Sequence, residues 1–201
     1  MTKEEELILT RAREKFMREG FHRTTMDEIA SELRMSKKTI YKYFPSKEKL
    51  VNAAVTLLQK YIANNVTKII ESDDNAVLKI YKIFEFIGKI MEKVNEKTLE
   101  DFRRRLPEVW QRIDDFRTKL IQENLTTVVN QGKEEDLILP YPTSIIMAIY
   151  VAGIRAVINP EFLMNSSFSL TEVKNIALDM MMCAVLTDKG KEIFNKYKQG
   201  N

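Results

Sequence analysis

A short segment near the N-terminus concentrates the side chains best suited to binding a polyanion. Hydroxyl groups, flat aromatic rings and ammonium groups alternate there at Ser36, Lys37, Lys38, Thr39, Tyr41, Lys42, Tyr43 and Lys47. Ammonium groups attract phosphates, and hydroxyl groups donate hydrogen bonds to phosphates or to base edges. The N-terminus of a helix itself favours anions. A short helix presenting this set fits the major groove of B-DNA, so the segment predicts a DNA-reading helix.

Such a helix needs others to support it, and the preceding residues supply them. A first helix has apolar residues at helix-face spacing and ends at Gly20; these are Leu7, Ile8, Ala12, Phe16 and Met17. Thr25 followed three residues later by Glu28 predicts a capping box that opens a second helix. Ser36 caps a third helix over 37–43, and Pro45 breaks it. Ser46 then caps a long fourth helix that runs from residue 47 towards 70.

The remaining sequence also has helical periodicity. It predicts helices over 76–94, 98–106, 108–131 (closed by Gly132), 143–158 and 170–186, with a frayed terminal helix at 191–198. A loop with Pro160 separates 143–158 from 170–186. No run of residues reads as a strand or a repeat. The prediction is an all-α protein with a helix-turn-helix domain over 1–46 and a larger helical domain over 47–201.

Composition narrows the class of protein. The chain of 201 residues is 44% hydrophobic and 30% charged, which allows a sizeable core. Its single cysteine, Cys183, excludes an intramolecular disulfide and a multi-cysteine metal site, and it fits the cytoplasm. The N-terminus does not resemble a secretory signal. The longest apolar stretch, 145–158, is too short to span a bilayer and contains Arg155, so we expect no membrane association.

The positive charge lies at one end of the chain. The net charge is +3, and residues 1–50 contain 12 basic and 9 acidic residues, so the remainder is neutral. An excess this small does not demonstrate nucleic-acid binding, but it coincides with the predicted reading helix.

The N-terminal motifs resemble those of the TetR family of one-component transcriptional regulators. The resemblance rests on Gly20-Phe21, on Thr25 with Ile29-Ala30, and on Ser36-x-x-Thr39-x-Tyr41-x-Tyr43-Phe44-x-Ser46-Lys47-Glu48-x-Leu50. It covers residues 7–50. It implies that Thr25 and Lys47 meet phosphates, that Lys37, Lys38, Thr39 and Lys42 face the groove, and that Tyr41 and Tyr43 pack and touch the DNA backbone.

Two positions depart from the family pattern. Arg34-Met35 stands where the family usually has a glycine in the turn, so either Arg34 has a positive φ or the turn differs. Lys38 stands where the family often has a small residue, and its long cation could itself read guanine.

The resemblance further implies that residues 47–201 form an effector-binding and dimerisation domain, with an effector pocket among the middle helices. The candidate lining residues are Phe84, Met91, Phe102, Trp110, Phe116, Met147 and Tyr150. Each of them, taken singly, also fits a plain hydrophobic core.

Two later helices have the pattern of a dimer interface. Residues 143–158 are apolar nearly all round, and Ala148, Ala152 and Ala156 recur every four residues, which permits close helix approach. Residues 170–186 also carry an apolar stripe. Pairing both helices with their symmetry mates gives a homodimer that reads two half-sites of a near-palindromic duplex operator.

The expected function is that of a repressor released from its operator by a small hydrophobic or amphipathic effector. The alternative keeps DNA binding but assigns control to a protein partner. An enzyme is disfavoured, because the sequence has no glycine-rich phosphate loop, no nucleophile elbow and no metal cluster, and no cofactor is expected.

Overall fold

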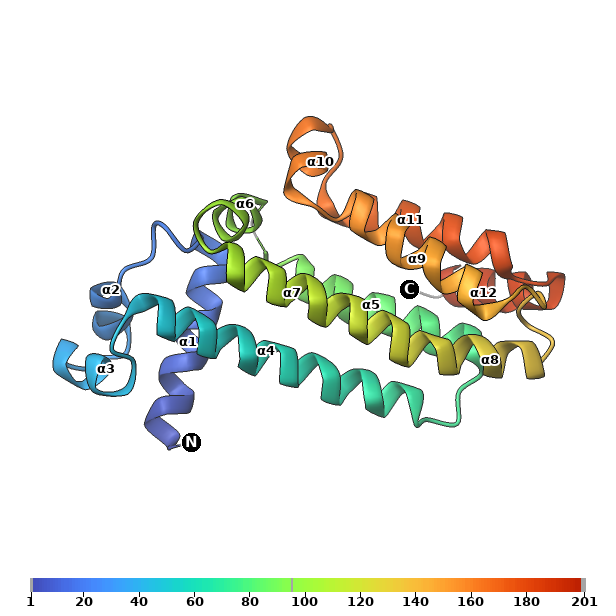
Figure 1. The fold of residues 1–201 in the computed structure, drawn as a ribbon. Coiled ribbons are helices and arrows are strands. Elements are labelled where there is room, and N and C mark those ends of the chain that lie inside the picture. The colour runs from blue at the N-terminus through green and yellow to red at the C-terminus, as the bar shows by residue number, and fades with distance from the viewer. Residues whose placement is uncertain (1, 95, 200–201) are drawn as a thin grey trace. The chain divides into compact units, whose positions relative to one another are not determined.

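The structure is a computed structural model that describes residues 2–94 and 96–199 (Figure 1). Its helices are α1 (Lys3–Glu19), α2 (Met26–Glu32), α3 (Lys37–Tyr43), α4 (Lys47–Ile70), α5 (Ala76–Met91), α6 (Glu96–Arg105), α7 (Pro107–Leu120), the π-helical turn η1 (Ile121–Leu125), α8 (Thr126–Glu134), α9 (Thr143–Val157), α10 (Pro160–Asn165), α11 (Leu170–Val185) and α12 (Asp188–Gln199). Within the described residues, extended pairing is limited to one isolated bridge between Ile138 and Leu186. The all-α prediction is confirmed.

The chain divides into two compact units. The first comprises Met1–Ile62 and Lys93–Asp114, and the second comprises Ala63–Glu92 and Asp115–Asn201. The boundary falls within α4, and the first unit includes α6 and the start of α7 as well as the first three helices. The functional division proposed at residue 46 remains a prediction.

The first unit has a continuous hydrophobic core. Ile8 from α1, Ile29 from α2 and Ile40 from α3 are fully buried in it, and Leu50 from α4 joins them. Phe102 of α6 and Val109 of α7 belong to the same core, and Leu106, Trp110 and Ile113 pack against it. The three-helix head is therefore supported by α4 and also by a segment about fifty residues further along the chain.

The predicted helix starts are confirmed by their capping bonds. The Thr25 hydroxyl accepts from the Glu28 N–H at 3.2 Å, and the Glu28 carboxylate accepts from the Thr25 N–H at 2.8 Å. The Ser36 hydroxyl accepts from the Thr39 N–H at 3.0 Å, and that of Ser46 accepts from the Lys49 N–H at 3.2 Å. At the end of α1, Gly20 has a φ of 87°, a conformation that favours glycine.

The second unit is a layered set of helices. α5 packs against α8, α11 and α12, and α9 packs against α8 and α11 (Figure 1). Its core includes Val77 and Ile80 of α5, Val128 of α8 and Met182 of α11. Two buried lysines are paired there: Lys79 donates to the Gln131 side chain at 2.9 Å, and Lys174 meets the Glu85 carboxylate at 3.2 Å.

Three details differ from the sequence predictions. The single helix expected over 108–131 is wrong, since η1 interrupts it, and Gly132 lies inside α8 rather than closing it. A Cβ at Gly132 would lie 2.5 Å from the Ile138 side chain, so close packing explains this glycine. The loop after α9 contains the short helix α10, and the terminal helix begins at Asp188 and packs on α5.

No helix in the described residues is long and apolar enough to cross a membrane.

Candidate DNA-binding surface

Helix α3 separates an inner apolar side from an outer polar one. Ile40 is fully buried, and Phe44, the residue that follows the helix, is 5% exposed. Lys37, Lys38, Tyr41 and Lys42 are exposed, whereas Thr39 and Tyr43 are partly buried. The aromatic residue that plugs the core is thus Phe44 rather than Tyr41. Ser36, which caps the helix, and Thr25, which caps α2, are exposed as well, so six of the nine predicted contact residues are open to a partner.

The turn between α2 and α3 resolves the alternative left open at Arg34. Arg34 has a φ of 53°, the left-handed conformation that glycine adopts more easily. The Met35 N–H donates to the Ala30 carbonyl at 2.9 Å, which closes the turn over the end of α2. The helix-turn-helix geometry is therefore kept without the glycine, with the Arg34 backbone strained.

Several polar groups on this surface are engaged within the protein. The Ser36 and Thr39 hydroxyls lie 2.8 Å apart, and Thr25 forms the capping box with Glu28. The Lys37 ammonium pairs with the Asp27 carboxylate of α2. The Tyr43 hydroxyl donates to the Glu4 carboxylate of α1 at 2.5 Å. Sequence reasoning missed the last two pairs, because residues ten and thirty-nine positions apart meet only through the turns between helices.

Lys47, at the start of α4, is held closely. Its ammonium lies 4.1 Å from the centre of the Phe21 ring and donates to the His22 carbonyl at 3.4 Å. Partial burial lowers the pKa of Lys47, and the carboxylates of Glu48 and Asp101 oppose that effect. The His22 N–H in turn donates to the Asp101 carboxylate of α6 at 3.1 Å. The lysine is thus held against the segment that joins α1 to α2.

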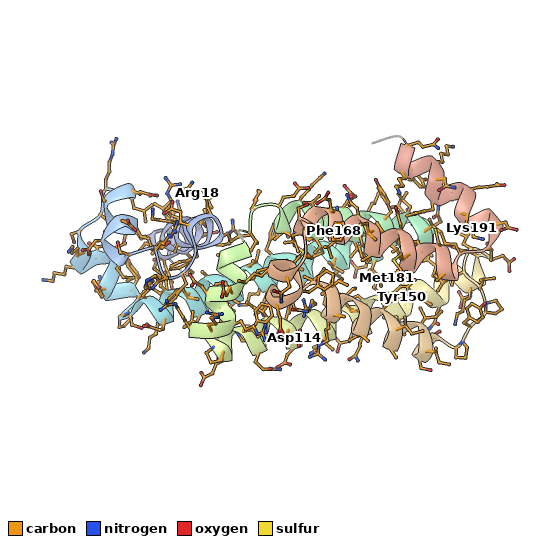
Figure 2. All side chains as sticks on the ribbon, turned by 90° about the horizontal axis from the view of Figure 1, so that it is seen from above. Arg18, Asp114, Tyr150, Phe168, Met181 and Lys191 are labelled. Atoms are coloured by element: carbon orange, nitrogen blue, oxygen red, sulfur yellow. The ribbon has the colours of Figure 1, made fainter. Side chains whose placement is uncertain are left out.

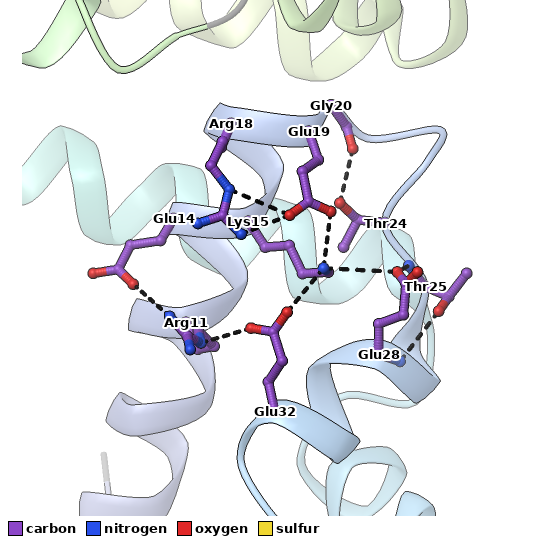
Figure 3. Close-up of polar contacts among 10 residues, drawn as sticks. All are labelled: Arg11, Glu14, Lys15, Arg18, Glu19, Gly20, Thr24, Thr25, Glu28 and Glu32. Carbon is purple, nitrogen blue, oxygen red and sulfur yellow. Dashed lines mark hydrogen bonds and ion pairs between the residues drawn. The ribbon is translucent and has the colours of Figure 1, made fainter.

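A buried ionic cluster fixes α1 against α2 (Figure 3). The Lys15 side chain is only 7% exposed, and its ammonium meets the Glu19 carboxylate at 2.8 Å and the Glu32 carboxylate at 2.9 Å. Arg11 joins the same Glu32 carboxylate at 2.8 Å. The hydrogen bond from Lys15 is the main reason why the pKa values of Glu19 and Glu32 are lowered. The cluster ties the last residue of α2 to α1.

Comparison with known proteins shows what the N-terminal segment is similar to. The family model for bacterial regulatory proteins of the tetR family matches residues 8–54, the segment that forms α1 to α3 and the start of α4. This N-terminal segment is thus similar to the helix-turn-helix domain of tetR-family regulators. The match includes α3, which supports the interpretation of its exposed surface as a candidate DNA-binding surface.

Similar proteins extend the likeness beyond the matched segment. The chain is 25% identical over 169 residues to the uncharacterized HTH-type transcriptional regulator YvaF of Bacillus subtilis, covering 82% of this chain and 87% of that protein. A transcriptional regulator from Cytophaga hutchinsonii has the same fold, with a TM-score of 0.70 and 21% identity. The match covers 92% of this chain and 100% of that one. A regulator from Saccharomonospora viridis, solved in complex with choline, also has this fold. Its TM-score is 0.69 and its identity 16%, and the match covers 93% of this chain and 100% of that one.

The candidate effector residues fall into two groups. Phe102 is buried in the core of the first unit, and Trp110 packs against that core. The other five lie in the second unit: Phe84, Met91 and Phe116 are partly buried, and Met147 and Tyr150 are buried. The Tyr150 hydroxyl donates to the Met181 carbonyl at 2.7 Å (Figure 2), and burial raises the Tyr150 pKa.

Proposed function

We propose that this regulator is a repressor that binds a near-palindromic duplex operator as a homodimer and is released by a small hydrophobic or amphipathic effector. The main support for the DNA-binding residues is that α3 has two different sides. Its apolar side is buried, and its other side exposes Lys37, Lys38, Tyr41 and Lys42. Exposed cations that are not needed for the core are suited to phosphates and guanine edges. Such a protein acts where the chromosome is, in the cytoplasm.

Dimerisation is supported by an apolar surface formed by α9 and α11, which we call the α9–α11 face. On α9 it comprises Ile145, Ala148, Ile149, Ala152 and Ala156, and on α11 it comprises Ile176, Met180 and Ala184. Ile149 and Met180 are 63% and 69% exposed, an arrangement that a helix facing only water does not favour. Val173 is buried within the unit and belongs to the opposite side of α11. Two copies pairing through this face would present two reading helices to one operator.

Control by a small molecule is supported by one similar protein. The regulator from Saccharomonospora viridis, which has the same fold, was solved with choline. The alternative, control by a protein partner, is tested by screening small molecules for an increase in Tm, because a ligand that binds only the folded state raises it. Failure of all compounds, with association to a co-purified protein, would favour the alternative.

The DNA-binding assignment is tested with duplexes selected from a random library by the parent protein. Lys38→Ala and Thr39→Ala are expected to change the ranking among selected sequences, because these residues face base edges. If both variants keep the parent's ranking, α3 does not lie in the groove.

Lys47→Ala tests the contribution of phosphate contacts. It is expected to weaken binding to all sequences equally and to reduce the slope of log affinity against log salt by about 0.9, because one phosphate contact is lost. An unchanged slope would show that Lys47 does not contact the DNA backbone. Circular dichroism of the variant is the control, since Lys47 also packs on Phe21.

A further inference from the structure

Two donors on the DNA-binding surface are occupied by the protein's own carboxylates. The Lys37 ammonium, at the first residue of α3, pairs with Asp27 of α2. The Tyr43 hydroxyl, at the last residue of α3, donates to Glu4 of α1 at 2.5 Å. The reading helix therefore carries an anionic partner from a neighbouring helix at each of its ends.

These pairs are not part of the core. The side chains of Lys37 and Asp27 are 66% and 54% exposed, and Glu4 is also exposed. Exposed ion pairs contribute little to folding stability, so the pairs are not explained as packing devices. Lys38 and Lys42, between them on the same helix, form no ion pair with any described residue. The carboxylates thus engage the two ends of α3 and leave its middle free.

A carboxylate and a phosphate compete for the same donor. A phosphate oxygen that binds Lys37 shares the ammonium with Asp27 or displaces it, and in both cases the Asp27 carboxylate lies in the negative field of the DNA. A duplex that places no donor near that carboxylate offers it no compensation. In a suitable operator the major groove offers the amino group of cytosine, which a carboxylate can accept from. The exchange therefore disfavours arbitrary sequences more than it disfavours a matching one.

We propose that Asp27 and Glu4 are specificity-determining residues, which restrain Lys37 and Tyr43 and thereby weaken binding to non-operator DNA. This inference rests on the proposed placement of α3 in the major groove. It assigns a function to acidic residues on a surface where only cations and hydroxyls were expected to matter.

The Asp27–Lys37 pair is tested by a double-mutant cycle of Asp27→Asn, Lys37→Gln and the double variant. Binding to a 30-base-pair duplex of scrambled sequence and to a duplex selected by the parent protein is measured by fluorescence anisotropy over a salt series. Asp27→Asn is expected to tighten binding to the scrambled duplex about fivefold and to steepen the salt slope by about 0.9, because Lys37 gains a phosphate. Affinity for the selected duplex should change less, so the ratio of the affinities for the selected and the scrambled duplex should fall. In the Lys37→Gln background the same substitution should have little effect.

Glu14→Gln is the matched control. The Glu14 side chain is 53% exposed and pairs with Arg11, so this variant makes the same change in net charge at a similarly exposed carboxylate of the same unit. It is expected to change affinity less than twofold. Asp27→Ser provides a second neutral variant that still suits the first turn of a helix, and equal Tm values would show that folding is intact.

The outcomes separate this inference from the proposed function. If Asp27→Asn leaves affinity and slope unchanged, or tightens binding equally with and without Lys37, the pair does not restrain the lysine and the inference fails. If the parent protein shows no salt-dependent binding to either duplex, the proposed function fails instead.

The Glu4–Tyr43 pair gives an independent test, with Glu4→Gln, Tyr43→Phe and the double variant. Glu4→Gln should tighten binding to the scrambled duplex about twofold to threefold only when the Tyr43 hydroxyl is present, as expected for one freed hydrogen bond. An equal gain in the Tyr43→Phe background would indicate simple removal of a negative charge and would overturn the assignment of Glu4.

Discussion

At the scale of single residues, Arg34 holds a backbone conformation that its side chain disfavours. Its φ of 53° lies in the left-handed region, where a residue with a Cβ is strained by about 1 kcal/mol. Arg34→Gly is expected to leave the free energy of unfolding unchanged or to raise it by up to about 0.6 kcal/mol, because relief of strain equals or exceeds the about 0.4–1 kcal/mol of entropy that a glycine adds to the unfolded chain. Urea denaturation at fixed pH measures the change. A clear loss of stability would mean that the exposed Arg34 side chain makes a stabilising contact that outweighs the strain.

Lys15 is the residue on which the ionic cluster depends. Lys15→Met removes the cation shared by Glu19 and Glu32 and leaves both carboxylates, each about 30% exposed, close together. We expect a loss of about 2 kcal/mol, less than for a fully buried pair because water reaches both carboxylates. Arg18→Met is the control, since Arg18 meets Glu19 from the solvent side and is 64% exposed. Equal stability of the two variants would contradict this role of Lys15.

The same cluster gives a direction for the pH dependence. The pKa values of Glu19 and Glu32 are lowered from the ordinary 4.5, so their contribution is present above about pH 4.5 and is lost as the pH falls through the lowered values. The pKa of Lys15 is raised above 10.5, so its contribution is lost only as the pH rises beyond that value. The difference in stability between parent and Lys15→Met should therefore be constant near neutrality and shrink below pH 4.5. A difference that grows on acidification would contradict the assignment.

At the scale of elements, Gly190 fixes α12 against the connection that follows α8. A Cβ at this position would lie 2.2 Å from the Leu137 carbonyl oxygen, and backbone atoms cannot move aside cheaply. Gly190→Ala is expected to destabilise the second unit by about 3 kcal/mol through overpacking. Gly153→Ala on α9, where a Cβ meets no atom within 4 Å, is the control in the monomeric protein. Thermal unfolding that ranks the two variants equally would contradict close packing at Gly190.

Local signals predicted the N-terminal elements closely, and the later ones less so. Thr25, Ser36 and Ser46 carry capping hydroxyls whose effect extends over one turn, so the sequence was sufficient to place α2, α3 and the start of α4. The packing of Phe102 on the first unit could not be foreseen, because helical periodicity identifies an apolar side without identifying its partner. Periodicity also predicted most of the exposed and buried residues of α3. It could not predict that Lys37 pairs with Asp27, because that contact depends on how α2 and α3 pack.

At the scale of the whole molecule, the proposed dimer is decided by the α9–α11 face. Ala152→Glu places a charge at the centre of that face, where close helix approach would leave it without water. The expected result is a monomer in sedimentation that has lost tight operator binding, since two reading helices are needed for specific affinity. Thr127→Glu, at an exposed position of α8, is the control and should sediment as the parent does. A tight dimer in the Ala152→Glu variant would rule out this face and leave the DNA-binding assignment untouched.

The π-helical turn η1 at Ile121–Leu125 has a consequence for how the chain tolerates changes in length. A π-helical turn encloses one more residue than an α-helical turn, so this stretch holds a residue that a regular helix does not need. Removing one residue here would let the two flanking helices join as a regular α-helix, with Val128 and Val129 still facing the core. The same deletion at Thr126 or Thr127 of α8 would rotate every later residue by about 100° and turn that apolar pair away from the core. Shortened chains are therefore expected to fold when the missing residue comes from η1 and to fail when it comes from α8.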